Sequence, residues 1–247
     1  MKIPIQKIWD KRFLLRSIIH TIYFNFHYLP FKQACKLPIF LYKPKFVKCK
    51  GTISIESDNI RSRMIRLGFM HVPIFPNSGI IWENNGKVVF SGTCNIGNAS
   101  AISTGKTGNI IFGNNFSALC GLKITSFHQI RFGENTGIGW DSIIMDTSFH
   151  KVKDINNCQV GKGYGSVIFG KNNWLGNRCI VLPGTKSPDY CIFGAGSILN
   201  KDYSSNPTHI LMAGNPLTVK RTGVWRDKGV DDSLEYENLH DIQAPGS

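Results

Sequence analysis

The residue with the strongest chemical signal in this 247-residue sequence is His150. A histidine can accept a proton from a hydroxyl group near neutral pH, and a neighbouring carboxylate can orient its ring. Asp146 lies four residues before His150 and Asp154 four residues after it, so both are candidates for the orienting group. This pattern indicates a general base, provided that the fold presents His150 to an acceptor hydroxyl.

His150 falls where a six-residue period in the sequence is interrupted. The first residues of successive repeats are 20 apart from Phe112 to Phe132, but 37 apart from Phe132 to Phe169. A long loop on a repetitive scaffold is a candidate for function. The period is carried by fifteen residues, in groups of three: Phe90, Ile96, Ile102; Phe112, Ala118, Ile124; Phe132, Ile138, Ile144; Phe169, Leu175, Val181; and Ser187, Phe193, Leu199.

The period itself predicts a parallel β-helix. Three hexads make one coil, and each hexad supplies one short strand and one corner. Larger residues at Phe116, Leu122, Ile130 and Asn173 interrupt a second pattern, so we expect less regular coils there. That second pattern places small residues two positions before the large ones, as a narrow interior requires: Cys94, Ser100, Thr136, Ser142, Cys179, Thr185, Cys191 and Ser197.

The net charge of +13 is concentrated at the N-terminal end. Residues 1–50 contain eleven Lys or Arg against the single acid Asp10, interleaved with apolar and aromatic residues at partly helical spacing. This basic arm could lie on an anionic membrane surface. It could instead pack on the end of the β-helix or on a neighbouring subunit. Nucleic acid is not an expected partner, because no recognised binding module accompanies the charge.

Several features indicate a cytoplasmic protein, with peripheral contact at the inner face of the membrane as a role for the arm. No run of eighteen uncharged apolar residues predicts a membrane-spanning helix. The apolar stretch 13–29 lacks the cleavage site of a signal peptide. Seven cysteines without a CxxC pair favour a reducing compartment.

These patterns divide the chain into three parts. Residues 1–45 form a basic amphipathic arm that is partly helical. Residues 46–222 form the β-helix domain, with irregular first coils at 46–89 and a loop insertion at 146–166. Residues 223–247 form an acidic C-terminal tail.

Motifs over residues 85–222 resemble the hexapeptide-repeat acyltransferases. Besides the hexads and the looped-out histidine, they are Phe169-Gly170-Lys171-Asn172-Asn173-Trp174-Leu175-Gly176-Asn177, Leu182-Pro183-Gly184, Gly194-Ala195-Gly196-Ser197, Asn200-Lys201-Asp202 and Ala213-Gly214-Asn215-Pro216. The segment 146–150 looks most like the branch that O-acetylates bacterial surface polysaccharides. The resemblance implies a left-handed parallel β-helix, a homotrimer with active sites between subunits, acetyl-CoA as co-substrate and a saccharide as acceptor.

The resemblance also assigns roles to residues. His150 becomes the general base, and no metal is required; Asp146 is kept as its catalytic partner because of its position four residues before the histidine. Trp174, Gly176 and Asn177 would follow the pantetheine arm, while Gly194 and Ala195 would offer backbone groups to its amides. Asn200, Lys201, Lys220 and Arg221 would lie toward the nucleotide end. Trp174 and the glycines could equally be corner residues, and Lys220 and Arg221 ordinary solvated charges.

Alternatives stay open at this point. Lys151 follows His150, where sugar acetyltransferases of this type commonly have proline, so His128 is a second candidate base. N-acetylation of an amino sugar or nucleotide sugar is a rival reaction, although no GxGxxG segment precedes residue 90. A β-helix like that of the γ-type carbonic anhydrases would need three converging histidines, including a close pair that this sequence lacks. A non-catalytic β-helix is the third class.

Overall fold

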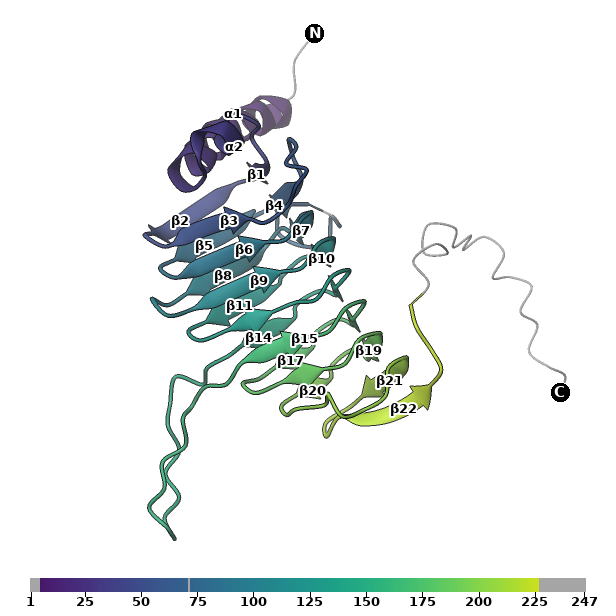
Figure 1. Cartoon of the computed structure of the whole chain (residues 1–247). Helices are drawn as coiled ribbons and strands as arrows, with labels where there is room; N and C mark the ends of the chain where they lie inside the picture. Colours follow the sequence, from purple (N-terminus) through teal and green to yellow (C-terminus); the bar gives the residue numbers. More distant parts are fainter. Residues whose placement is uncertain (1–4, 71, 227–247) are drawn as a thin grey trace, which may run out of the picture.

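The computed structural model describes residues 5–70 and 72–226, with side chains from residue 17 onward. From β1 to β20 its strands wind through three sheets in turn, so that every third strand lies in the same sheet (Figure 1). Neighbouring strands of the described coils pair in parallel, and the antiparallel pair comes at the C-terminal end. The three sheets form the sides of a left-handed parallel β-helix, which confirms the fold class predicted from the hexads.

Each sheet is named here by its strands. Sheet A contains β1 (Ile39–Leu41), β4 (Ile65–Phe69), β7 (Cys94–Gly97), β10 (Phe116–Ala118), β13 (Gly137–Ile138), β16 (Trp174–Leu175), β19 (Cys191–Phe193), β21 (Ile210–Ala213) and β22 (Thr218–Thr222). Sheet B contains β2 (Pro44–Cys49), β5 (Ile80–Asn84), β8 (Ser100–Thr104), β11 (Lys123–Ser126), β14 (Ile143–Met145), β17 (Ile180–Val181) and β20 (Ile198–Leu199). Sheet C contains β3 (Thr52–Ile55), β6 (Lys87–Phe90), β9 (Asn109–Phe112), β12 (Ile130–Arg131), β15 (Val167–Phe169) and β18 (Lys186–Ser187).

The interior is built from the residues that the period selects. All fifteen members of the hexads and all eight small residues are buried, as predicted. On sheet C, the rings of Phe90, Phe112, Phe132 and Phe169 stack coil upon coil, with centroids 5.3, 5.7 and 5.7 Å apart. Each ring therefore gains contacts above and below it.

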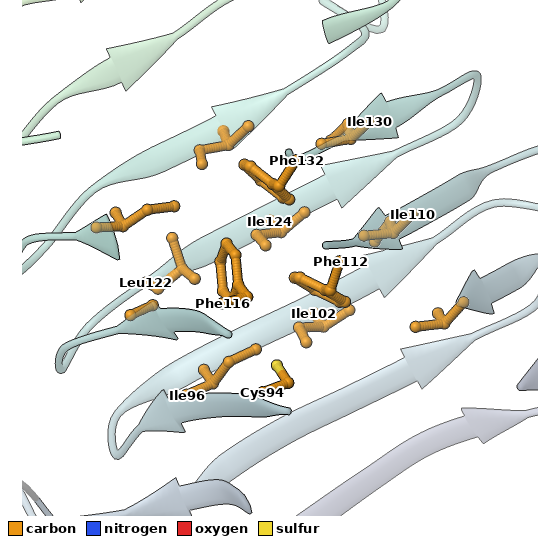
Figure 2. Close-up of a cluster of buried hydrophobic side chains, with 14 of the residues drawn as sticks. Cys94, Ile96, Ile102, Ile110, Phe112, Phe116, Leu122, Ile124, Ile130 and Phe132 are labelled. Atoms are coloured by element: carbon orange, nitrogen blue, oxygen red, sulfur yellow. The ribbon is translucent and has the colours of Figure 1, made fainter. Parts of the chain in front are cut away.

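The coil around Phe116 is more regular than expected. Its ring lies 4.8 Å from that of Phe112 and 4.9 Å from that of Phe132 (Figure 2). The strands β7, β10 and β13 pair across this position without a shift of register. The predicted irregularity is wrong here, because the interior beside the phenylalanine stack has room for one more large side chain.

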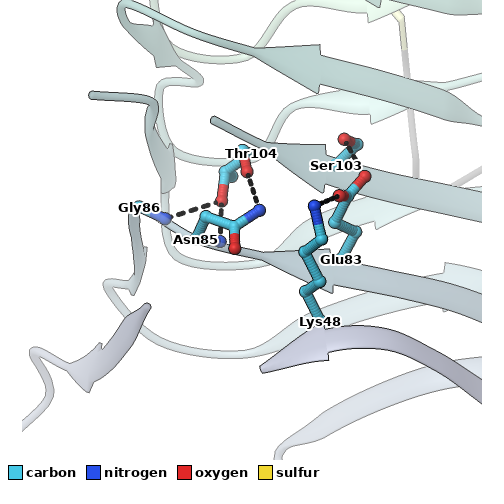
Figure 3. Close-up of polar contacts among 6 residues, drawn as sticks. All are labelled: Lys48, Glu83, Asn85, Gly86, Ser103 and Thr104. Carbon is cyan, nitrogen blue, oxygen red and sulfur yellow. Dashed lines mark hydrogen bonds and ion pairs between the residues drawn. The ribbon is translucent and has the colours of Figure 1, made fainter. Parts of the chain in front are cut away.

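Polar contacts tie the first coils together on the outside of sheet B. Glu83 on β5 receives a hydrogen bond of 2.8 Å from the hydroxyl of Ser103 on β8, and it pairs with Lys48 on β2 at 3.6 Å (Figure 3). At the next corner, the hydroxyl oxygen of Thr104 accepts the N–H groups of Asn85 and Gly86, both at 3.0 Å. Such cross-strand pairs support the register of neighbouring coils.

Two helices cover the N-terminal end of the stack: α1 (Ile5–Tyr28) and α2 (Phe31–Ala34) (Figure 1). Polar side chains at four-residue steps on α1 satisfy the free backbone edge of the first coil, which would otherwise lack partners. The side-chain oxygen of Ser17 accepts the N–H of Lys43 at 3.1 Å. In the same way, Thr21 accepts the N–H of Leu41 at 3.0 Å and Asn25 accepts that of Ile39 at 3.1 Å. The inner face of the basic N-terminal arm therefore packs on the end of the β-helix. In the described part of the chain, no helix is apolar and long enough to cross a bilayer.

The first strand of the β-helix does not coincide with the domain boundary expected at residue 46. The first strand of the coils, β1, precedes residue 46. Register shifts between Phe46 and Lys48 and between Leu67 and Phe69 make the first coils uneven. Beyond β22 the structure follows the chain to residue 226, so most of the expected acidic tail at 223–247 lies outside the described residues.

Candidate active site

The chain leaves the stack between β14 and β15 as an ordered arm, which comprises residues 146–166. The arm doubles back on itself through antiparallel bridges between Thr147 and Tyr164 and between Lys153 and Val160. Its neck is closed by a hydrogen bond of 2.9 Å from the N–H of Gly165 to the carbonyl of Asp146. Figure 1 shows it projecting from the stack on the side away from β19 and β21. The loop that interrupts the period is thus a defined element.

His150 lies near the neck of this arm and is exposed. The hydroxyl of Ser148 donates to the backbone carbonyl of His150 at 2.7 Å, which fixes the chain around it. The opposite side of the arm is Gly163, whose φ of 71° favours glycine. A Cβ at Gly163 would lie 2.5 Å from the carbonyl oxygen of His150, so the close approach also requires glycine. The backbone is held while the imidazole faces solvent.

Asp146 is buried and is engaged elsewhere. Its carboxylate accepts the hydroxyl of Ser126 at 2.7 Å and the N–H groups of Phe127 and His128 at 2.8 and 2.9 Å. Among the described residues it forms no hydrogen bond with the imidazole of His150. Its observed contacts hold the corner of the preceding coil against the neck of the arm, and a role in orienting His150 stays a prediction.

The second candidate base, His128, is also at this neck. It lies in the corner between β11 and β12 and is exposed. Its ring lies 5.1 Å from that of Tyr164 on the arm. The two candidate histidines therefore flank one region of the surface, at the corner between sheets B and C.

Aromatic side chains that the sequence did not single out surround this region. Phe127 and Phe149 meet edge to face, with centroids 5.0 Å apart, and they are 41% and 57% exposed. Tyr164 is 48% exposed. The coil spacing could have pointed to Phe127, because it lies one coil above the start of the arm. We define His128, His150, Phe127, Phe149 and Tyr164 as the neck site.

The residues predicted to follow pantetheine gather on a different side of the molecule. Trp174 lies on β16 of sheet A, and Gly176 and Asn177 follow it at the corner between sheets A and B. Gly194 and Ala195 occupy the same corner in the next coil. The N–H of Gly176 bonds to the carbonyl of residue 193 at 2.7 Å, which stacks the two corners directly. These five residues form the sheet A patch.

Two members of the sheet A patch have visible structural partners. The side-chain oxygen of Asn177 accepts the N–H of Trp140 at 2.9 Å and so secures the corner. The guanidinium of Arg226 lies 4.8 Å from the ring centre of Trp174. Sequence reasoning missed Arg226, because it comes after the repeats end and no period places it.

The residues predicted for the nucleotide end divide between two places. Asn200 and Lys201 follow β20 at the corner between sheets B and C. The hydroxyl of Tyr203 donates to the side-chain oxygen of Asn200 at 3.1 Å, and the ammonium of Lys201 lies 5.7 Å from the same ring. Lys220 and Arg221 are exposed on β22, which closes sheet A. A single chain therefore does not bring all the predicted site residues together.

No cluster of three or more His, Cys, Asp or Glu side chains suited to a metal ion occurs in the part of the chain that the structure describes. Burial raises the pKa values of the Cys94 and Cys179 thiols, and it raises that of Cys191 to about 12. Desolvation disfavours a thiolate at these positions. These cysteines are therefore interior packing residues, as expected from their positions in the hexads.

The fold and the looped-out histidine define a structural class, the parallel β-helix with an inserted arm. Comparison with known proteins shows which members of this class the chain is similar to. The galactoside O-acetyltransferase of Escherichia coli is 31% identical over 121 residues, which are 49% of this chain and 57% of that enzyme. The galactoside O-acetyltransferase of Lactococcus lactis is 30% identical over 113 residues, 46% of this chain and 53% of that enzyme. The chain thus spans about half the length of the relatives that it matches.

A solved structure of the polySia-specific acetyltransferase NeuO covers 80% of this chain and 90% of its own, with 17% identity and a TM-score of 0.45. No family model matches the chain. The sequence matches confirm the resemblance to the hexapeptide-repeat acetyltransferases that the motifs indicated.

Proposed function

We propose that this protein transfers the acetyl group of acetyl-CoA to a sugar hydroxyl of a bacterial surface polysaccharide or its precursor, with His150 as the general base. The observation that carries the proposal is the exposed imidazole of His150 at the neck of an ordered arm, on a β-helix whose matched relatives are named galactoside O-acetyltransferases. The matched relatives share about half their length with this chain, so the activity is proposed for it rather than taken from them.

The neck site suits a sugar acceptor. The exposed faces of Phe127, Phe149 and Tyr164 offer apolar surface to the C–H bonds of a sugar ring. His150 and His128 stand beside these rings and can bond to hydroxyl groups. A polar ring with an apolar face is therefore a suitable ligand for the neck site.

The chemical step follows from these positions. The neutral imidazole of His150 takes the hydroxyl proton while the sugar oxygen attacks the carbonyl carbon of the thioester. Negative charge moves to the carbonyl oxygen, where a backbone N–H from a coil of the neighbouring subunit would stabilise it. The intermediate then collapses, the C–S bond breaks and the sulfur of coenzyme A takes the proton from the imidazolium. Neither a metal nor a covalent enzyme intermediate takes part.

The sheet A patch would receive acetyl-CoA. Trp174, Gly176 and Asn177 would lie along the pantetheine chain, while Gly194 and Ala195 would offer backbone groups to its amides. Asn200, Lys201, Lys220 and Arg221 would face the nucleotide end, where cations suit phosphate groups.

The proposed active site needs a second copy of the chain. The sheet A patch and the neck site lie on different sides of one β-helix, so His150 of one subunit must meet the patch of another. The inserted arm also exposes apolar side chains: Val152, Ile155 and Val160 are 78%, 89% and 55% exposed. A homotrimer with closed rotational symmetry satisfies both requirements. We place it in the cytoplasm, with its basic arm at the inner face of the membrane.

The acceptor is tested by incubating the protein with acetyl-CoA and a panel of saccharides, followed by mass detection. The result expected is a saccharide that gains one acetyl group, together with stoichiometric release of coenzyme A. Absence of both, with acetyl-CoA bound, would contradict transfer to sugars. Transfer to an amino sugar nitrogen would favour the N-acetyltransferase alternative.

The shared site is tested by mixing two inactive variants. Subunits with His150→Ala and subunits with Trp174→Ala are coexpressed so that mixed trimers form. In random trimers about a quarter of the interfaces combine an intact His150 with an intact Trp174, so about a quarter of the wild-type activity should return. No recovery in verified mixed trimers would contradict a site between subunits.

A further inference from the structure

The outer face of α1 is apolar and about half exposed in the described chain. Ile18, Ile22 and Phe26 follow one another at four-residue steps, with Ile19 and Tyr23 beside them, and each is between 43% and 58% exposed. Ile18, Ile22 and Phe26 each follow one residue of the stripe that bonds to β1, so this row lies beside that stripe on α1. Figure 1 shows α1 at the extreme end of the stack. A continuous exposed apolar face of this kind marks an interaction surface.

A groove runs beside this face, between α1 and the strands β1 and β4. It has a volume of about 590 Å³, and Ile18 forms part of both the groove and the outer face of α1. Phe40 and Phe69 contribute apolar rings to its wall, and Arg63 and Arg66 contribute guanidinium groups. The groove therefore joins an apolar surface directly to two positive charges.

Arg63 and Arg66 contact aromatic rings rather than acidic side chains. The guanidinium of Arg63 lies 4.9 Å from the ring centre of Phe40, and that of Arg66 lies 4.9 Å from the ring centre of Phe69. Neither forms an ion pair within the described residues. A stacked guanidinium keeps its N–H edge available, and two such edges match the oxygens of a phosphate group.

The surrounding charge favours a lipid over a second copy of the chain. Residues 17–66 contain nine Lys or Arg and two acids. A symmetric contact between two such ends would oppose like charges, whereas an anionic membrane surface complements them. An anionic phospholipid also places its phosphate next to its acyl chains, as the groove lies next to the apolar face of α1.

We propose that the groove binds the phosphate group of an anionic phospholipid through Arg63 and Arg66, while the outer face of α1 lies in the membrane interface. This inference rests on the peripheral location within the proposed function and specifies what holds the protein there. The charge of the basic N-terminal arm alone would give a diffuse attraction, whereas the groove offers the guanidinium groups of two arginines to a phosphate.

The experiment measures binding of the full-length protein to phosphatidylcholine vesicles with and without phosphatidylglycerol, in the absence of acetyl-CoA. Two basic groups near the surface contribute about 1 kcal/mol each, so Arg63→Gln with Arg66→Gln should weaken binding to the anionic vesicles roughly 30-fold. The control Lys106→Gln with Arg131→Gln removes the same charge from exposed positions far from the groove and should retain binding.

A second pair of variants separates recognition from diffuse charge. Arg63→Lys with Arg66→Lys preserves the net charge but loses the planar stacking and paired N–H edges, so binding should fall about fivefold. Equal losses in the groove variants and the control, or no loss in either, would overturn the proposal. Inorganic phosphate is the remaining probe, and its binding is measured by calorimetry. If Arg63→Gln with Arg66→Gln loses phosphate binding but keeps vesicle binding, the groove would be assigned to free phosphate instead. Acetyl transfer to a soluble saccharide is assayed separately, so failure of one proposal does not imply failure of the other.

Discussion

Replacing Asp146 with alanine should loosen one coil of the β-helix and the neck of the arm together. The buried carboxylate accepts the N–H groups of Phe127 and His128 and the hydroxyl of Ser126, at 2.7–2.9 Å. The serine hydroxyl also lies 3.4 Å from the carbonyl of Asn109 and can turn toward it. Two backbone N–H groups then lose a charged acceptor, at about 1.5–3 kcal/mol each, so we expect a loss of about 3–6 kcal/mol.

The loss is measured by urea unfolding and its location by hydrogen exchange. Coils of a β-helix contact mainly their neighbours, so faster exchange should be confined to residues near 126–128 and 163–165. Asp154→Ala is the control, because its carboxylate accepts one N–H, that of Asn156, on the exposed arm; we expect a change within about 0.5 kcal/mol. A loss below about 1 kcal/mol in Asp146→Ala, with acetyl transfer abolished, would refute the structural role and assign the carboxylate to orienting His150.

Three further predictions concern the framework. Phe132→Ala removes the middle of the phenylalanine stack and should cost about 4 kcal/mol of unfolding free energy, whereas Phe31→Ala, at a side chain 73% exposed, should change thermal stability little. Asn25→Ala leaves an N–H and a carbonyl of β1 unpaired and should cost about 2 kcal/mol in the same thermal assay; no loss would contradict the capping role of α1. Burial raises the pKa of the Cys191 thiol from 9.0 to about 12, so stability should fall as the pH rises through that range, since the unfolded thiol ionises first. Iodoacetamide at neutral pH should accordingly modify the exposed Cys158 and spare Cys191, which mass mapping can check.

The sequence predicts the interior of this fold well because the coil geometry repeats locally. Each residue six positions from the last returns to the same place in the next strand, so Phe112 or Ile138 can be assigned without knowledge of distant contacts. The same logic located the arm. It was wrong about Phe116, because the period cannot measure how much free volume lies beside the phenylalanine stack.

Other features depend on contacts that no repeat encodes. The stripe Ser17, Thr21 and Asn25 has helical spacing, but its partner is the backbone edge of a strand, which carries no sequence signal. Asp146 lies 20 residues after Ser126, the same interval that separates Phe112 from Phe132. That spacing could have identified its role at the corner, had it been compared with the period. Arg226 follows the repeats, so its contact with Trp174 depends on the path of the returning chain.

The most direct test of the central claim is the rate of acetyl transfer by His150→Ala, compared with wild type on one saccharide acceptor. Removal of the general base should lower kcat by about 10²- to 10⁴-fold, while acetyl-CoA binding by calorimetry and the oligomeric state by size exclusion with light scattering stay unchanged. Near wild-type turnover in this variant would contradict the assignment of the base to His150.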